Sequence, residues 1–125
     1  MKRFGLVIAL MLGISKMSMA QAEIKFDETV HNFGKISKKN PKQEYTFTFT
    51  NVGDKPLIIN DAAPSCGCTV ANFTKEPVAP GKTGTIQAKF NAEYQQPAHF
   101  KKTITVLSNA KTAKVRIYIE GDVEE

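Results

Sequence analysis

The chain has 125 residues, of which 42% are hydrophobic and 23% charged, and its formal net charge is +5. This length suits a single domain, and the sequence contains no internal repeat and no low-complexity tract. Its basic residues occur singly or in pairs, without interleaved aromatic residues or a basic helix, so the charge gives no support for nucleic-acid binding.

The first 22 residues have the pattern of a secretory signal peptide. Lys2 and Arg3 give it a basic start, residues 4–14 are apolar, and small residues follow. Cleavage after Ala20 or after Ala22 would satisfy the small-x-small rule for the cleaved site. The apolar run is shorter than the roughly 20 residues that span a bilayer, and the cleavage site has no cysteine to carry a lipid. The sequence therefore predicts an exported protein of the periplasm or extracellular space, without a membrane anchor.

Removal of this leader changes the charge of the protein. Fourteen Lys and Arg residues remain against twelve Asp and Glu residues, so the net charge of the mature protein is +2. We expect one domain over residues 23–121, followed by a short acidic tail at 122–125.

Alternation of apolar and polar residues dominates the rest of the chain. In "QEYTFTFTN" at 43–51, Tyr45, Phe47 and Phe49 lie on one face of a predicted strand and are expected to pack in the core. Six further runs are rich in β-branched or aromatic residues, at 24–26, 29–33, 56–62, 84–90, 100–107 and 114–120. Turn signals separate the runs at 33–35, 40–41, 51–54, 79–82 and 108–110. This pattern predicts an all-β, antiparallel β-sandwich of about seven strands, with a closed barrel as the alternative.

The run "PLIIND" at 56–61 leads toward the two cysteines. Leu57 and Ile59 would lie on one face of a strand and Ile58 on the other, so both faces of this strand are apolar. That two-sided apolar character is typical of a strand in the middle of a sheet. We therefore predict a central strand here.

Five short motifs occur in an order that resembles a known family. They are "HNFGKI" at 31–36, "YTFTFTNVGDKPLII" at 45–59, "SCGCT" at 65–69, "VAPGKTGTIQAKF" at 78–90 and "FKKTITVLSN" at 100–109. Together they resemble the family called domain of unknown function 1573, over residues 26–121. The "SCGCT" turn after a "PLII"-type strand is the most specific of them.

The resemblance implies an exported immunoglobulin-like β-sandwich, related in shape to domains of cilia and centrosome proteins and to periplasmic chaperone-like sandwiches. It implies no established activity. The chain departs from the family pattern at His31 and Asn32, where an acidic residue is common, which weakens any role for His31.

Cys66 and Cys68, separated only by Gly67, are the candidate site residues, and four interpretations are open. They are two shielded thiols of the core, a disulfide, a two-coordinate site for a soft metal such as Cu(I), or a catalytic thiol. In an extended strand, residues two apart have Cα atoms roughly 6.5–7 Å apart, so a disulfide would need a kink, which Gly67 permits. Structural zinc needs four ligands, and neither His31 nor His99 is placed near the pair by the sequence.

The sequence favours a function without catalysis. No base is placed beside either cysteine, and no other catalytic group stands out, so we do not predict an enzyme. We expect an interaction or structural module of the cell envelope that binds a protein partner through a sheet edge or through the cysteine loop. The alternative is a thiol-redox or Cu(I)-binding protein that uses Cys66 and Cys68, and no cofactor is expected otherwise.

Overall fold

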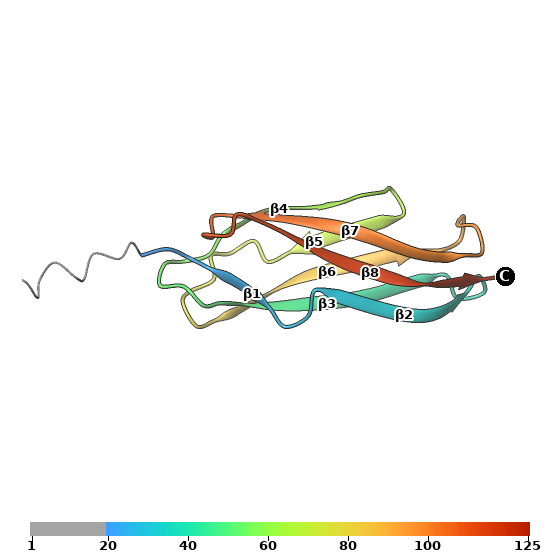
Figure 1. Ribbon diagram of the computed structural model, residues 1–125, viewed down its shortest axis with the longest axis horizontal. Coiled ribbons are helices and arrows are strands. Elements are labelled where there is room, and N and C mark those ends of the chain that lie inside the picture. The colour runs from blue at the N-terminus through green and yellow to red at the C-terminus, as the bar shows by residue number, and fades with distance from the viewer. Residues whose placement is uncertain (1–19) are drawn as a thin grey trace, which may run out of the picture.

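The computed structural model describes residues 20–125. Most of the leader expected at residues 1–22 therefore lies outside the described residues. Eight strands fill most of the described part of the chain (Figure 1). They are β1 (Ile24–Phe26), β2 (Val30–Ser37), β3 (Lys42–Asn51), β4 (Ile59–Pro64), β5 (Thr69–Phe73), β6 (Thr83–Asn91), β7 (His99–Ser108) and β8 (Lys114–Glu124).

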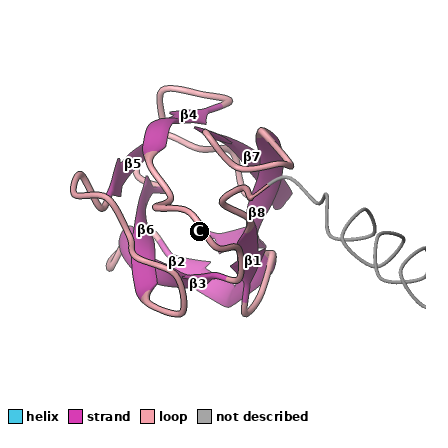
Figure 2. Ribbon diagram, turned by 90° about the vertical axis from the view of Figure 1, so that its left-hand side faces the viewer, coloured by secondary structure: helices cyan, strands magenta, loops and turns pink. Residues whose placement is uncertain are grey.

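The strands form two four-stranded sheets that pack face to face. One sheet has the order β1-β3-β6-β5 and the other the order β2-β8-β7-β4. The strands run along the long axis of the molecule in Figure 1, and the end-on view in Figure 2 shows them surrounding a common interior. This arrangement confirms the predicted β-sandwich, with eight strands rather than about seven.

One strand pair departs from the antiparallel expectation. β2 pairs with β8 in a parallel register that begins at Val30 opposite Tyr118, whereas every other paired neighbour is antiparallel. A bulge interrupts β2 between Asn32 and Lys35, where Gly34 has a φ of 72° and Asn32 Oδ1 accepts the Gly34 N–H at 2.7 Å. The sequence predicted a turn at residues 33–35, and the structure has this bulge there. A glycine with positive φ occurs in both structures, so the sequence does not distinguish them.

The inward faces of the strands build one apolar core. On β3, Phe47 is 1% exposed and Phe49 is fully buried, while Tyr45 is half-buried against them. Phe90 of β6 stacks on Phe100 of β7 with ring centroids 4.2 Å apart, and this contact joins the two sheets. The predicted core position of Phe47 and Phe49 is therefore confirmed.

The apolar run at 56–61 does not form a central strand. β4 begins only at Ile59 and lies at the edge of its sheet, and the Ile58 side chain is 40% exposed. Leu57 is fully buried in an isolated bridge with Val78. The run is apolar on both faces because Leu57 pairs with Val78, whereas Ile59 begins β4 and pairs with β7. Its apolar character does not come from burial of both faces within one sheet.

The acidic end of the chain is part of the fold. β8 continues to Glu124, and Val123 is buried and donates its N–H to Ala98 O at 2.9 Å. The expected acidic tail at 122–125 thus consists of strand residues up to Glu124. The part of the chain that the structure describes contains no helix long and apolar enough to cross a bilayer.

Candidate functional site

The two cysteines lie in the turn that joins the two sheets between β4 and β5. β4 ends at Pro64 and β5 begins at Thr69, so residues 65–68 cross from the edge of one sheet to the edge of the other. Both ends of this turn are held by hydrogen bonds. Ser65 N donates to Thr103 O at 2.8 Å, Thr103 N donates to the Ser65 hydroxyl at 3.1 Å, and Asn91 N donates to Cys68 O at 3.0 Å.

Cys66 and Cys68 are joined by a disulfide, with their Cα atoms 5.4 Å apart. This distance is shorter than the roughly 6.5–7 Å of an extended strand, so the turn supplies the kink that closure of the bridge needs. Both residues are half-buried, and the described residues contain no free cysteine. Among the four interpretations of the pair, the structure contains the disulfide and not two shielded thiols.

Gly67 is less important for the bridge than its position suggests. Its φ is not in the left-handed region, and a Cβ placed on it would meet no atom within 4 Å. The backbone of the turn is therefore open to an L-residue at this position. The kink comes from the anchored ends of the turn and not from a conformation that only glycine adopts.

The surroundings of the sulfur atoms contain few chemical groups. The buried Thr69 hydroxyl lies 4.0 Å from Cys66 Sγ and 3.8 Å from Cys68 Sγ, and within residues 20–125 no other side chain forms a hydrogen bond to either sulfur. The same residues contain no group of three or more His, Cys, Asp or Glu side chains arranged to hold a metal ion. Reduction would leave at most two thiolate ligands at this turn.

The two histidines have partners elsewhere. The His31 ring stacks on the Tyr45 ring with centroids 3.6 Å apart, and burial lowers the pKa of His31, although the nearby Glu28 carboxylate opposes this effect. The Tyr45 hydroxyl hydrogen-bonds the Glu28 carboxylate, which raises the pKa of Tyr45. His99 Nδ1 lies 3.0 Å from Asp122 Oδ1 at the beginning of β7. Neither histidine forms a hydrogen bond to the cysteine turn.

A groove of about 440 Å³ lies beside Cys68 on the outer face of the β1-β3-β6-β5 sheet. Exposed side chains such as Lys42, Glu44 and Lys89 line it together with residues that belong to the core or pack against it, Phe90 and Cys68. Val70 of β5 is 54% exposed beside it. The lining residues are Lys42, Gln43, Glu44, Gly67, Cys68, Val70, Lys89, Phe90 and Asn91.

β5, which follows the disulfide directly, is an open sheet edge. Among residues 20–125 its one paired neighbour is β6, and the flanking bonds from Asn91 N to Cys68 O and from Thr74 N to Thr85 O show which backbone groups face that partner. In an antiparallel ladder the alternate residues direct their backbone groups away from the partner strand. Ala71 and Phe73 therefore present their N–H and C=O groups to the open side of the sheet.

The other three edges are less suitable for pairing with an added strand. β1 has only three residues, and β2 is interrupted by the bulge at Gly34. On β4 the outward positions are Ala62, whose N–H already donates to Asp61 Oδ1 at 2.9 Å, and Pro64, which has no N–H. Bulges and prolines are common means of protecting sheet edges. The sequence predicted a sheet edge or the cysteine loop as the interaction site, but it did not predict β5, which lay outside the expected strands.

Comparison with known sequences gives one family match. The family described as "Protein of unknown function (DUF1573)" matches residues 24–123 of the chain. No curated protein matches the chain.

Several solved structures have the same fold. A protein of unknown function from Porphyromonas gingivalis superposes with a TM-score of 0.73 at 14% identity, over 87% of this chain and 50% of that one. The YadV chaperone gives 0.61 at 14% identity, over 82% and 53% of the two chains. PapD-like domain 7 of human CEP192 gives 0.62 at 10% identity, over 88% and 92%. The chain thus spans about half the length of the first two proteins, and at these identities the likeness shows the fold alone.

Proposed function

We propose that this chain, which belongs to the DUF1573 family of proteins of unknown function, is an exported, non-enzymatic β-sandwich module. In this proposal it binds a protein partner at β5, where an extended segment of the partner adds a strand to the sheet. The observation that carries the proposal is the open edge at Ala71 and Phe73, because within residues 20–125 the other three edges are short, bulged or lacking donors.

Strand addition combines backbone pairing with side-chain contacts, and β5 offers both. The outward N–H and C=O groups of Ala71 and Phe73 would pair with the partner backbone. On the outer face of the sheet, Val70 and the groove beside Cys68 would receive side chains of the added strand. Lys42 and Lys89 outnumber the one carboxylate of the groove, Glu44, and would favour an acidic side chain.

Export and protein binding are supported by the leader pattern and by the named neighbours. The SfaE protein, described as a periplasmic chaperone, gives a TM-score of 0.62 at 12% identity. YadV is also described as a chaperone. Chaperones bind other proteins, so the shared fold is compatible with protein binding by this chain.

The test is recovery of a partner from an envelope extract by the exported protein at low micromolar concentration, followed by affinity measurement with variants. Val70→Asp places beside the edge a negative charge that would repel an acidic side chain of the added strand, and Ala71→Pro removes an outward donor that takes no part in the ladder to β6. Both are expected to weaken binding about tenfold or more, a loss of about 1.4 kcal/mol. Val52→Asp is the matched control, because Val52 is also 54% exposed but follows the last residue of β3, away from β5.

Hydrogen exchange gives the complementary readout. With the partner bound, the amides of Ala71 and Phe73 are expected to exchange more slowly, since they would then be hydrogen-bonded. Failure to recover a partner, or equal binding by all three variants, would contradict the proposal.

A second candidate function is thiol chemistry at the cysteine turn, which the half-exposed disulfide favours. A dithiol reductant, itself oxidised to a disulfide, would supply the two electrons and two protons that open the bridge to two thiols, and their thiolates would form a two-coordinate site for Cu(I). Intact mass after iodoacetamide treatment, with and without reductant and in native and denaturing buffer, measures how readily the bridge opens. A Cu(I) adduct of the reduced protein that is absent from the Cys66→Ser/Cys68→Ser variant would support this function.

A further inference from the structure

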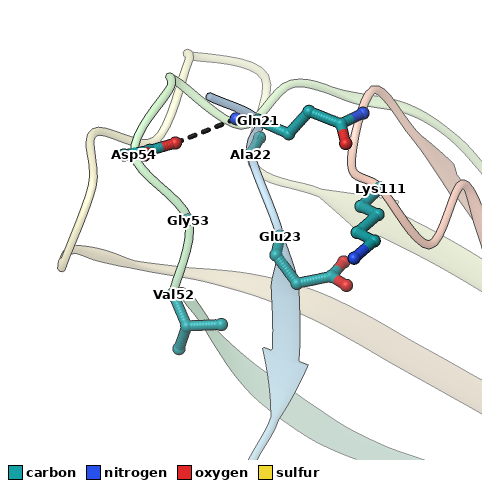
Figure 3. Close-up of a pocket in the computed structure, with 7 residues that line it drawn as sticks. All are labelled: Gln21, Ala22, Glu23, Val52, Gly53, Asp54 and Lys111. Atoms are coloured by element: carbon teal, nitrogen blue, oxygen red, sulfur yellow. Dashed lines mark hydrogen bonds between the residues drawn. The ribbon is translucent and has the colours of Figure 1, made fainter. Parts of the chain in front are cut away.

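The segment Gln21–Glu23, before β1, is built into the sandwich along its whole length. Gln21 N donates to Asp54 Oδ1 at 2.9 Å, and Asp54 N donates back to Gln21 O at 2.9 Å (Figure 3). Val52 N donates to Glu23 O at 2.8 Å. On its other side the segment is held by Lys111, whose N–H donates to Ala22 O at 2.9 Å.

Burial and close approach show that the fold depends on this segment. Ala22 is 2% exposed and belongs to the apolar core. A Cβ on Gly53 would lie 2.5 Å from Glu23 N and closer still to Gln21 O, so a side chain at position 53 is incompatible with the segment in this place. Figure 3 shows the backbone of Gly53 running directly beside that of Ala22.

The Glu23 side chain fixes the end of the segment nearest to β1. Its carboxylate accepts the Thr112 N–H at 3.1 Å and the Thr112 hydroxyl at 2.9 Å, and Glu23 N donates to Asn51 Oδ1 at 3.3 Å. Residues from three regions far apart in the sequence therefore meet here.

These contacts distinguish the two possible cleavage sites of the leader. A cut after Ala22 would remove Gln21 and Ala22, expose part of the core and leave the N–H groups of Asp54 and Lys111 without acceptors. It would also convert Glu23 N into a charged ammonium. A cut after Ala20 would retain every one of these contacts.

We infer, on the basis of the export proposed above, that the mature protein begins at Gln21 and that Asp54 binds its new α-ammonium group. In the cleavage, water adds to the Ala20–Gln21 peptide bond, its oxygen becomes part of the Ala20 carboxylate, and the Gln21 nitrogen is released as an amine that is protonated near neutral pH. The Gln21 nitrogen already lies 2.9 Å from Asp54 Oδ1. After cleavage this contact becomes a charge-assisted hydrogen bond, which is stronger than the neutral one.

The first test is the N-terminus of the exported protein. The full precursor, with its own leader, is expressed in a secreting host, and the exported product is identified by intact mass and N-terminal sequencing. The expected product begins at Gln21. A product that begins at Glu23 or at any other residue would overturn the inference.

The second test measures the ammonium site directly. An activated ester acylates only the neutral form of an amine, and near pH 7 it prefers the α-amine over lysines. Labelling of Gln21 is expected to be slower in native than in denatured protein, and Asp54→Asn is expected to accelerate native labelling by roughly threefold or more.

Asp27→Asn is the control, because Asp27 is an exposed aspartate next to the end of β1 whose side chain forms no hydrogen bond among the described residues. Equal labelling of native and denatured wild-type protein would overturn the docking of the ammonium without the need for a variant. An Asp54→Asn rate equal to that of Asp27→Asn would do so as well.

Discussion

The cysteine turn and the Gln21–Glu23 segment lie at opposite ends of the same sheet, and they are held in different ways. The cysteine turn lies near the beginning of β3 and is fixed at its two ends, while its middle is exposed. The segment lies beside the end of β3 and is hydrogen-bonded on both sides, with Ala22 in the core. The conspicuous cysteine motif is therefore the lightly held region, and an inconspicuous stretch beside the predicted leader is the firmly held one.

The glycines of the two regions show the same contrast. Gly67 stands in open space, whereas Gly53 touches the backbone of the neighbouring segment. Both look like ordinary turn glycines in the sequence. A glycine can serve as a spacer or as a point of close backbone approach, and only its neighbours in space show which role it has.

The largest expected effect on the free energy of unfolding comes from a substitution in the apolar core. Phe47→Ala removes a ring that is 1% exposed at the centre of the core, and we expect it to lower the free energy of unfolding by about 3–5 kcal/mol. Urea denaturation measures this loss. Tyr94→Ala, at a position that is 86% exposed, is the control and should leave the midpoint nearly unchanged.

Gly53→Ala tests the firmly held region. The added methyl group must displace the backbone at Gln21 and Glu23, and we expect a loss of about 1–3 kcal/mol in the free energy of unfolding. Gly67→Ala is the matched control at the other end of the sheet, with an expected change within about 0.5 kcal/mol. Equal effects of the two substitutions in thermal or urea denaturation would refute the contrast between the regions.

Removal of the disulfide tests the lightly held region. The bridge closes a loop of three residues, for which chain entropy gives a stabilisation of about 1.6 kcal/mol. We expect the Cys66→Ser/Cys68→Ser variant to fold and to lose no more than about this amount. A variant that fails to fold would show that the bridge organises the whole sandwich.

The smallest effect concerns the pH dependence at Glu23. Burial favours the neutral acid, but hydrogen bonds from Thr112 and Ile24 and the charge of Lys111 outweigh it, so the pKa of Glu23 lies below its ordinary value of 4.5. A carboxyl group whose pKa is lower in the folded state stabilises the fold above its unfolded pKa, and this contribution is lost as the pH falls through the folded value.

The difference in stability between wild type and Glu23→Gln should therefore be largest above pH 4.5 and should shrink in more acidic buffer. Denaturation midpoints measured from pH 7 down to pH 3 check this expectation. A stability difference that grew as the pH fell would contradict stabilisation of the Glu23 carboxylate by these hydrogen bonds.

The sequence predicted the features that depend on local periodicity. The alternation at 43–51 predicted β3 and its buried phenylalanines, and the resemblance of five motifs predicted the family and the immunoglobulin-like sandwich. The sequence did not predict β5, because "TVANF" is short and does not alternate strictly between apolar and polar residues. The sequence predicted a turn at residues 33–35, where the structure has a bulge at Gly34, because a glycine with a positive φ occurs in both.

Pairing partners and contacts between distant residues decided the rest. Local pattern shows which side chains face inward, but it does not show that β2 pairs with β8 in parallel, that β4 lies at an edge, or that β5 is the open edge. These features depend on which strand lies next to which in the folded chain.

By itself, the sequence determined a β-sandwich with an aromatic core and two cysteines separated by a single glycine, since period-two patterning and spacing are local properties. Only the tertiary structure decided that those cysteines form a disulfide in an anchored turn, that β5 is left without a second neighbour, and that Gln21–Glu23 belongs to the fold. The physical reason is that backbone groups of a strand or turn are satisfied by residues far away in the sequence, so their availability is a property of the assembled sheets.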